Sequence, residues 1–455
     1  MFLLAQRRTK LKIHALHNLH MGAPKKIEIK ALKWGDIIEV VFKKTPLHGE
    51  FLRYESAEKV FVLKLKSGYD IAIDARDVSS LRLIERGEKN RPLEKVIANK
   101  VDFTGADLAI ITTGGTISSK VDYRTGGVSP SVPSDYYFQI APGLKRFGKI
   151  AINDVMHVLS EDMRPADWLT IAKTASRAIS AGVKGVIVTM GTDTMHFASS
   201  AVSFLLNPLS VPVVFTGAQR SPDRGSSDAS TNLMLSATAA SRWNGGESVI
   251  CMHATMNDDY NFILRGNRAR KMHTERRDAF RPINTVPLAK VHLDGKIEEL
   301  GRHIPKSRET SFNPKLDDNV ALMMSYPGMS GEAIKSNLNT GAHGIVIAGT
   351  GFGNLPLNDK GVAKALLDAE KRDVPVVITS QTVYGATNRF VYSTLREMSR
   401  FRNIIYVEDM TTETAFVKLM FVLGKTKDID EINEMMTRPL ARESGGPHRF
   451  DAFLV

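Results

Sequence analysis

The stretch "ADLAIITTGGTISS", residues 106–119, decides how the central part of the chain folds. It begins with a short apolar run without polar alternation, which is typical of a strand buried on both faces of a parallel sheet. Gly114 and Gly115 follow and indicate a tight turn, which places Thr116 where the strand meets its loop. Such a loop either cradles a phosphate or carries a nucleophile.

Apolar runs of the same kind recur after residue 105 and alternate with helical patterns, which indicates an α/β fold with parallel strands and crossover helices. One amphipathic helix is predicted between Pro165 and Gly182. The predicted strands are "LAIITT", "GVIVTM", "VPVVFTG" and "SVICMHA", then "VALMMSY", "GIVIAGTG", "VPVVITS" and "NIIYVED".

Changes of pattern along the chain predict its domains. Residues 31–86 show short alternating runs broken by turn residues, which indicates a small antiparallel β-barrel-like module. The polar stretch 87–104 is predicted to be a linker. A second polar, irregular stretch at 283–318 separates the two groups of strands. We therefore expect a large α/β domain at 105–314 and a smaller α/β domain at 315–455.

The net charge of +12 is concentrated in two places. Residues 1–30 hold seven Lys or Arg against one acidic residue, and we expect a flexible basic tail. A nucleic-acid arm, or a biological start at Met21, are the alternatives. The segment 265–281, "RGNRARKMHTERRDAFR", also has seven basic residues, and either contacts a binding partner or is a solvated loop.

The composition indicates a cytoplasmic protein, and the spacing of its histidines indicates no metal site. The single cysteine, Cys251, lies in an apolar run and is expected to be buried and inert. No window approaches the ~20 apolar residues of a membrane span, and the N-terminus lacks a secretory pattern. The histidines have no metal-ligand spacing and are expected at the surface or at strand ends, namely His157, His196, His253, His273 and His292.

The phosphate interpretation of the first loop fails on its details. A P-loop requires Gly-x-x-x-x-Gly-Lys followed by Ser or Thr, and a dinucleotide loop requires Gly-x-Gly-x-x-Gly; "TTGGTISS" has neither. The nucleophile interpretation needs a base near Thr116, because a threonine hydroxyl is a poor nucleophile on its own. Asp193 and Lys271 can supply that base beside Thr192, and backbone N–H groups at Gly115 and Gly191 can stabilise an oxyanion.

Over residues 105–450 the chain resembles the bacterial-type L-asparaginase family. "TTGGTISS" is similar to the family's first signature and "TMGTDTMHFAS" to its second. "LSEDMRPADWLTIAK" is similar to its substrate-binding segment, with Glu161 in place of the family's glutamine. The resemblance implies an asparaginase-like two-domain parallel-sheet fold behind the N-terminal module.

The same resemblance implies the roles of the site residues. Thr116 is the expected nucleophile, and Tyr123 is matched, through its loop alone, to the family's activating tyrosine. The implied second triad is Thr192, Asp193 and Lys271. The implied substrate-binding residues are Gly115, Ser160, Glu161 and Gly191, together with Asn354 of "GTGFGN", which in this family reaches the site from a neighbouring subunit of a homodimer.

The first hundred residues and the segment "HTERRDAFR" depart from the asparaginase pattern. Together with the asparaginase-like part they resemble the D-subunit family of archaeal glutamyl-tRNA(Gln) amidotransferases. This resemblance implies a glutaminase that supplies ammonia to an E-type transamidase subunit, while this chain itself needs no cofactor. The E-type subunit uses ATP and Mg and makes most of the contacts with tRNA(Gln). The basic segment 265–281 would then contact tRNA or this partner. The alternatives are a stand-alone cytosolic asparaginase or glutaminase, and a catalytically idle RNA-binding scaffold.

Overall fold

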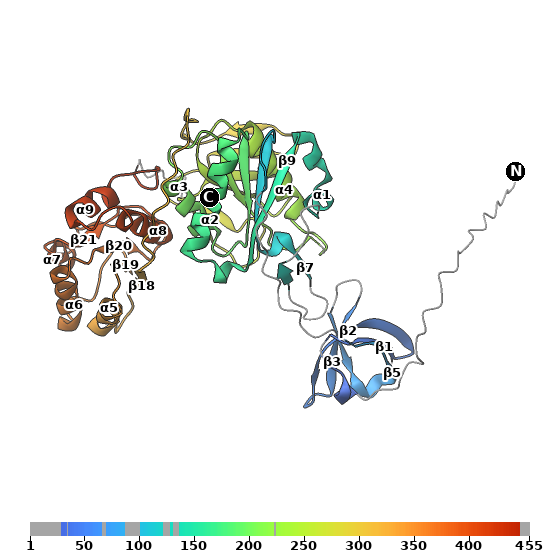
Figure 1. The fold of residues 1–455 in the computed structure, drawn as a ribbon. Coiled ribbons are helices and arrows are strands. Elements are labelled where there is room, and N and C mark those ends of the chain that lie inside the picture. The colour runs from blue at the N-terminus through green and yellow to red at the C-terminus, as the bar shows by residue number, and fades with distance from the viewer. Residues whose placement is uncertain are drawn as a thin grey trace, which may run out of the picture. The chain divides into compact units, whose positions relative to one another are not determined.

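The chain forms two compact units, which comprise residues 1–92 with 122–127, and residues 93–121 with 128–455. Figure 1 labels many of their helices and strands. Among the residues described, none of the helices combines the length and apolar character that a membrane span requires. The computed structural model describes residues 29–33, 35–65, 70–86, 101–121, 128–130, 136–222 and 224–445.

The N-terminal unit is a five-stranded antiparallel sheet with strand order β4-β3-β2-β1-β5. Alternation in β1 buries Ile38 and Val40 against a small apolar core, and Lys43 and Lys44 take left-handed φ angles of 47° and 69° in the turn to β2. The sheet confirms the predicted β module. Its elements are η1 (Ile29–Ala31), β1 (Ile37–Phe42), β2 (Thr45–Glu55), β3 (Val60–Leu65), β4 (Asp70–Asp74), η2 (Ala75–Asp77) and β5 (Val78–Glu85).

The second unit is built around an eight-stranded sheet with the order β17-β16-β13-β12-β11-β10-β6-β9. Five neighbouring strands, β9, β6, β10, β11 and β12, are parallel, and the other three are antiparallel. The strands are β6 (Leu108–Gly114), β9 (Ile150–Val158), β10 (Gly185–Thr189), β11 (Val213–Thr216), β12 (Ser248–His253), β13 (Tyr260–Arg265), β16 (Ala289–His292) and β17 (Ile297–Glu299).

Side-chain alternation in β6 shows how helices cover both faces of this sheet. Leu108 and Ile110 face a core that includes α4, whereas Ala109 and Ile111 face a core that includes α2 and α3. The helices and 3-10 turns of this part are η3 (Thr116–Ser118), α1 (Tyr136–Ile140), η4 (Pro142–Phe147), η5 (Ser160–Asp162), α2 (Pro165–Ser180), α3 (Met195–Leu205) and α4 (Ala229–Arg242).

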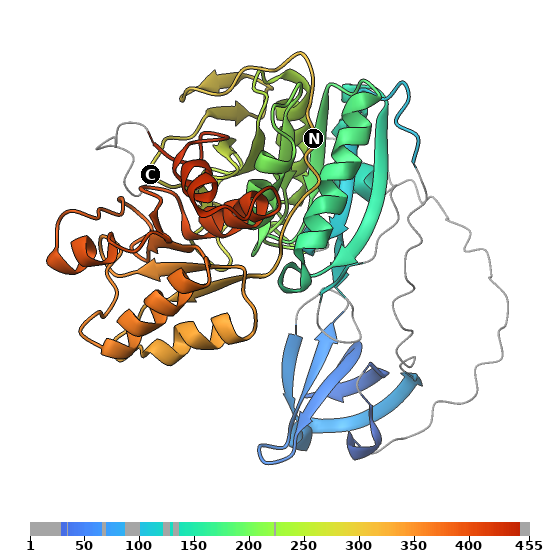
Figure 2. The ribbon, with the colours of Figure 1, turned by 60° about the vertical axis from the view of Figure 1, so that its left-hand side comes forward.

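The C-terminal lobe of this unit contains a parallel four-stranded sheet, β18-β19-β20-β21, with helices on both faces (Figure 2, orange to red). Ile345 and Ile347 of β19 face α5 and α6, while Val346 faces α8 in the core that also holds α2 and α3. The two sheets therefore share one core. The lobe comprises β18 (Val320–Met324), α5 (Gly331–Asn339), β19 (Gly344–Gly349), α6 (Lys360–Lys371), β20 (Val376–Ser380), α7 (Ser393–Met398), β21 (Ile404–Tyr406), α8 (Thr412–Leu423) and α9 (Ile429–Thr437).

The α/β fold and the eight predicted strands are confirmed, and the large sheet also has antiparallel strands beside the parallel ones. The stretch 283–318 holds β16 and β17, which add antiparallel strands at one edge. Two further short hairpins stand outside the large sheet, formed by β7 (Ser119–Val121) with β8 (Val128–Pro130) and by β14 (Ala269–Lys271) with β15 (Phe280–Pro282).

Candidate active site

Two glycine loops meet at the carboxyl ends of the neighbouring parallel strands β6 and β10. Gly115 has φ +76°, and a Cβ placed on it would lie 2.2 Å from the backbone nitrogen of Gly191. Only glycine fits so close an approach of two backbones. Thr116 and Thr192 each follow one of these glycines, so the contact brings both threonines to one edge of the sheet, where ligands of α/β proteins bind.

Lys271, the last residue of β14, reaches the second of these loops. Its Nζ donates hydrogen bonds to Thr192 Oγ1 at 2.8 Å and to Asp193 Oδ1 at 2.6 Å. The lysine side chain is only 8% exposed, whereas that of Asp193 is 66% exposed. An amine held against a hydroxyl can accept its proton when the amine is neutral, and the carboxylate fixes its orientation. The three residues therefore have the geometry of a base and its hydroxyl partner.

Ser160 brings the end of β9 into the same place. A Cβ on Gly191 would lie 2.1 Å from Ser160 Oγ, and Thr194 Oγ1 donates to the Ser160 carbonyl oxygen at 2.9 Å. Ser160 is buried, whereas Glu161 beside it is exposed. The ends of three adjacent strands thus contribute residues that the sequence singled out.

A buried tyrosine beneath the two loops was missed by the sequence analysis. The Tyr137 hydroxyl is hydrogen-bonded to Ser118 Oγ, in the turn that begins at Thr116, and to Thr189 Oγ1 at the end of β10 at 2.9 Å. Burial raises the pKa of Tyr137 to about 12, so the phenol stays neutral. Its partners lie far away in the sequence, and no local pattern could have pointed to it.

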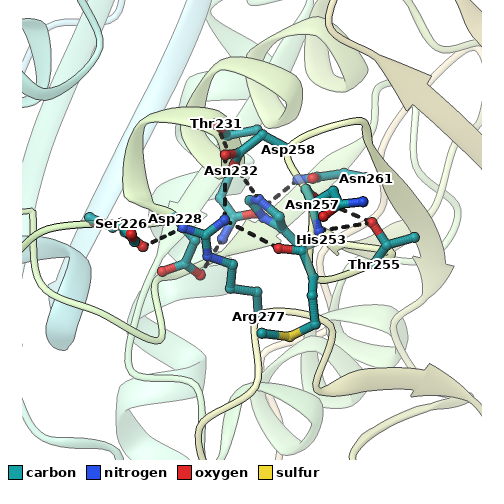
Figure 3. A network of polar contacts seen from close by, with 12 residues as sticks. Ser226, Asp228, Thr231, Asn232, His253, Thr255, Asn257, Asp258, Asn261 and Arg277 are labelled. Carbon is teal, nitrogen blue, oxygen red and sulfur yellow. Dashed lines mark hydrogen bonds and ion pairs between the residues drawn. The ribbon is translucent and has the colours of Figure 1, made fainter.

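Two of the histidines expected at the surface or at strand ends, His196 and His253, are buried. His253 does end β12, but it is buried, with Nδ1 2.6 Å from Asn232 Oδ1 and Nε2 2.9 Å from Asp258 Oδ1 (Figure 3). His196 lies in the first turn of α3 and is also buried, so the expectation was wrong for it. Burial, with help from the charges of Arg270 and Lys271, lowers the pKa of His196 to about 3.

Every lysine and arginine of the segment 265–281 has an acidic partner within the chain. In five of the pairs the acidic side chain is at most 9% exposed, and two of the four acidic residues in these five pairs, Asp409 and Glu413, come from the C-terminal lobe. The pairs are Arg265–Glu247, Arg268–Asp409, Arg270–Glu413, Lys271–Asp193, Arg276–Asp278, Arg277–Asp258 and Arg281–Asp278. The basic side chains of the segment are therefore paired with carboxylates within the chain, while residues 272–276 between β14 and β15 are exposed.

Among the expected site residues, Tyr123 lies outside the described residues and Asn354 is not brought to these loops. Asn354 is hydrogen-bonded within the C-terminal lobe, where its Nδ2 donates to the Thr350 carbonyl oxygen at 3.3 Å and its Oδ1 accepts from Thr394 Oγ1 at 3.2 Å. Across the described ranges, no three His, Cys, Asp or Glu side chains gather where they could hold a metal ion.

Comparison with known proteins identifies families that share this sequence pattern and fold. Residues 107–303 match the family model described as "Asparaginase, N-terminal", and residues 319–436 match "Glutaminase/Asparaginase C-terminal domain". A solved structure of the L-asparaginase from Thermococcus kodakarensis superimposes with a TM-score of 0.68 and 31% identity, and covers 75% of this chain and 99% of that one.

Two further relatives are similar to this chain over almost its whole length, beyond the asparaginase-like part. The chain is 39% identical over 422 residues to the D subunit of the glutamyl-tRNA(Gln) amidotransferase from Sulfolobus acidocaldarius, a match that covers 92% of this chain and 93% of that protein. It is 40% identical over 429 residues to the protein of the same name from Methanosphaera stadtmanae, with 92% and 95% covered. Both findings agree with the resemblances carried by the threonine motifs and by the first hundred residues.

Proposed function

This chain belongs to the asparaginase family, among the D subunits of glutamyl-tRNA(Gln) amidotransferase, and from that premise we propose that it is a glutaminase with Thr116 as its nucleophile. The observation that supports this most strongly is the placement of Lys271 Nζ, 2.8 Å from Thr192 Oγ1 and 2.6 Å from Asp193 Oδ1, beside the glycine contact that carries Thr116. This arrangement is suited to acyl transfer, in which a hydroxyl is activated by a neighbouring base.

The proposed reaction has two steps. Thr116 Oγ attacks the side-chain amide carbon of glutamine, the C–N bond breaks, and ammonia leaves with the proton that the hydroxyl gave up. Water then cleaves the threonine ester, which yields glutamate and restores Thr116. In both steps Lys271, acting through Thr192, takes and returns the proton, and Asp193 holds the amine in place.

Substrate binding is assigned to the loop residues around the threonines. Ser160, buried against Gly191, and the exposed Glu161 beside it take the α-amino and α-carboxyl ends of glutamine, with help from Gly115. The backbone N–H at Gly191 is the proposed oxyanion donor. Tyr123 remains the proposed activating tyrosine.

The relatives' names support a larger assembly. We assign the ammonia to an E-type transamidase subunit that uses ATP and Mg and binds tRNA(Gln), in the cytoplasm where tRNA is charged. This chain itself is proposed to use no cofactor. Asparaginase-like domains of two copies pair so that Asn354 of one reaches the site of the other. Ammonia passing between subunits would be lost if it escaped to water, so glutamine turnover is expected to rise when tRNA is bound.

A stand-alone asparaginase is the second candidate, favoured by the structural likeness to the Thermococcus kodakarensis enzyme over 75% of the chain. An idle scaffold is disfavoured, because Lys271 keeps contacts with both Thr192 and Asp193 that the proposed reaction would use. The deciding experiment measures ammonia release from glutamine and from asparagine by the purified chain, alone and with the partner subunit and glutamyl-tRNA(Gln). Glutamine turnover that rises with partner and tRNA supports the proposal, and fast asparagine hydrolysis by the chain alone contradicts it.

A further inference from the structure

We propose that the first turn of α8 in the C-terminal lobe holds both sides of the Lys271–Asp193 contact, and that Arg270, Glu413 and Thr414 are positioning residues for Lys271. The inference rests on the proposed catalytic role of Lys271. It goes beyond that role because it assigns a function to the basic segment and to a lobe that none of the triad residues belongs to.

The strand β14 presents its residues to two different partners. Side chains alternate between the two faces of a strand, so Lys271 lies on the face opposite to Arg270. Lys271 reaches Thr192 and Asp193, whereas Arg270 Nε lies 3.2 Å from Glu413 Oε1 in the first turn of α8. The ion pair on one face therefore fixes the strand that carries the lysine on the other.

A buried pair strengthens the same attachment one step earlier in the chain. Arg268, directly before β14, forms an ion pair with Asp409, and both side chains are at most 4% exposed. Arg268 also donates to the carbonyl oxygens of Asn284 at 2.8 Å and Gly445 at 2.9 Å. A buried arginine held by a carboxylate and two backbone carbonyl oxygens has little freedom to move, so the strand enters the site from a fixed point.

Thr414 connects α8 to the other side of the contact. Its Oγ1 donates a hydrogen bond to the carbonyl oxygen of Asn267, a residue shortly before β14, at 2.8 Å. The same Oγ1 lies 3.0 Å from Ser200 Oγ in α3. Helix α3 begins directly after the Thr192–Asp193 loop. One buried hydroxyl thus touches both the segment before Lys271 and the helix after Asp193, and so sets the distance between them.

The far end of the β14–β15 hairpin is fastened to the large domain (Figure 3). Arg277 donates to the carbonyl oxygens of Ser226 and Met256 and forms an ion pair with Asp258 at 3.4 Å. The hairpin is therefore held at its tip by the large domain and at its base by α8. Of these two attachments, the one at the base crosses between the lobes.

The kinetic test uses two conservative variants with matched controls, assayed as the full chain with partner subunit and glutamyl-tRNA(Gln). Glu413→Gln and Thr414→Val are each expected to lower kcat for glutamine about tenfold, with KM changed less than about twofold, since misplacing a reacting group by about 1 Å costs up to about 10²-fold. The controls Asp430→Asn, which breaks the exposed Arg402–Asp430 pair, and Thr437→Val at the end of α9 are expected to keep the wild-type kcat.

The pH profile separates a positioning role from a loss of stability. The charged or titratable groups around Lys271 are Asp193, Arg270, Glu413 and the buried His196. Glu413→Gln leaves the positive charge of Arg270 unbalanced, and a nearby positive charge disfavours protonation of a general base, so the acidic limb of the kcat profile moves to lower pH. Arg270→Met moves it to higher pH, and the double variant returns it to the wild-type position.

Hydrogen exchange decides the inference independently of catalysis. Amides of residues 268–272 are expected to exchange at least about fivefold faster in Glu413→Gln and Thr414→Val than in their controls, because the base of the hairpin opens more often. Unchanged exchange together with an unchanged pH profile would overturn the inference. Lys271→Met in the same assay tests the proposed function: if it keeps wild-type turnover, that function fails, while the exchange result still decides whether α8 holds the strand.

Discussion

Gly115 and Gly191 are in backbone contact, and a Cβ on the first would lie 2.2 Å from the nitrogen of the second. The contact joins the ends of two parallel strands and places the residue after each glycine, Thr116 and Thr192, at the same edge. Neither glycine is exchangeable, since Gly115 also has a left-handed φ of +76° and Gly191 packs on Ser160.

Gly115→Ala is expected to destabilise the fold by about 2 kcal/mol or more and to lower glutamine turnover, because it adds backbone strain and a clash with backbone. Denaturant unfolding and ammonia release measure the two effects. Gly225→Ala is the control, since a Cβ there meets nothing within 4 Å. Equal stability of the two variants would show that the two backbones are not in close contact.

Tyr137→Phe removes the one hydroxyl that bridges Ser118 and Thr189. The buried hydroxyls of Ser118 and Thr189 then lose their hydrogen bonds to Tyr137, which is expected to lower the free energy of unfolding by about 1–2 kcal/mol. We also expect a several-fold lower kcat, because the turn that carries Thr116 loses a link to β10. Tyr406→Phe, whose hydroxyl donates to the Leu395 carbonyl oxygen in the C-terminal lobe, provides the comparison. A Tyr137→Phe enzyme with wild-type kcat would mean that the bridge has no part in placing Thr116.

His196 makes stability depend on pH below neutrality. Its pKa falls from 6.5 in the unfolded chain to about 3 in the folded protein. Between these values only the unfolded chain binds the proton, so stability is complete above pH 6.5 and is lost progressively as the pH falls toward 3. When the pH falls from 7 to 5, the free energy of unfolding of the wild type should decrease by about 2 kcal/mol more than that of the His196→Gln variant. Unfolding curves with parallel pH dependence would contradict this.

Cys251 is expected to be unreactive in the native protein. It is buried in β12, and burial raises the pKa of its thiol to about 12, which suppresses the thiolate. An aromatic disulfide reagent should not react with the folded chain. After denaturation it should release one equivalent of its aromatic thiolate, since the chain has a single cysteine. Rapid labelling of the native protein would indicate an open core around β12.

Much of the fold could be predicted because its central strands are continuous apolar runs ended by glycine. Strand β9 was missed, since Asp154 and His157 interrupt its apolar pattern; the structure shows that Asp154 accepts a hydrogen bond from Thr112 at 2.6 Å and pairs with His157. Strands β16 and β17 were missed because they are short and lie at the edge of the sheet, in a polar stretch.

The site was predictable only as far as its motifs are local. The threonine loops carry their own pattern, and the structure brings Lys271 to the second of them. The ion pairs of the basic segment could not be predicted, because the acidic partners Glu247, Asp409 and Glu413 come from distant parts of the chain. A run of basic residues in a sequence does not show whether their side chains are solvated or form ion pairs with carboxylates.

The central claim is that Thr116 is the nucleophile, and ammonia release from glutamine by Thr116→Ala tests it most directly. The variant should keep the wild-type circular dichroism and unfolding midpoint, since Thr116 is only half buried at the start of a short turn. We predict that its turnover falls by at least about 10³-fold, because the acyl-enzyme can no longer form. A folded Thr116→Ala protein that still releases ammonia at a wild-type rate would contradict the account.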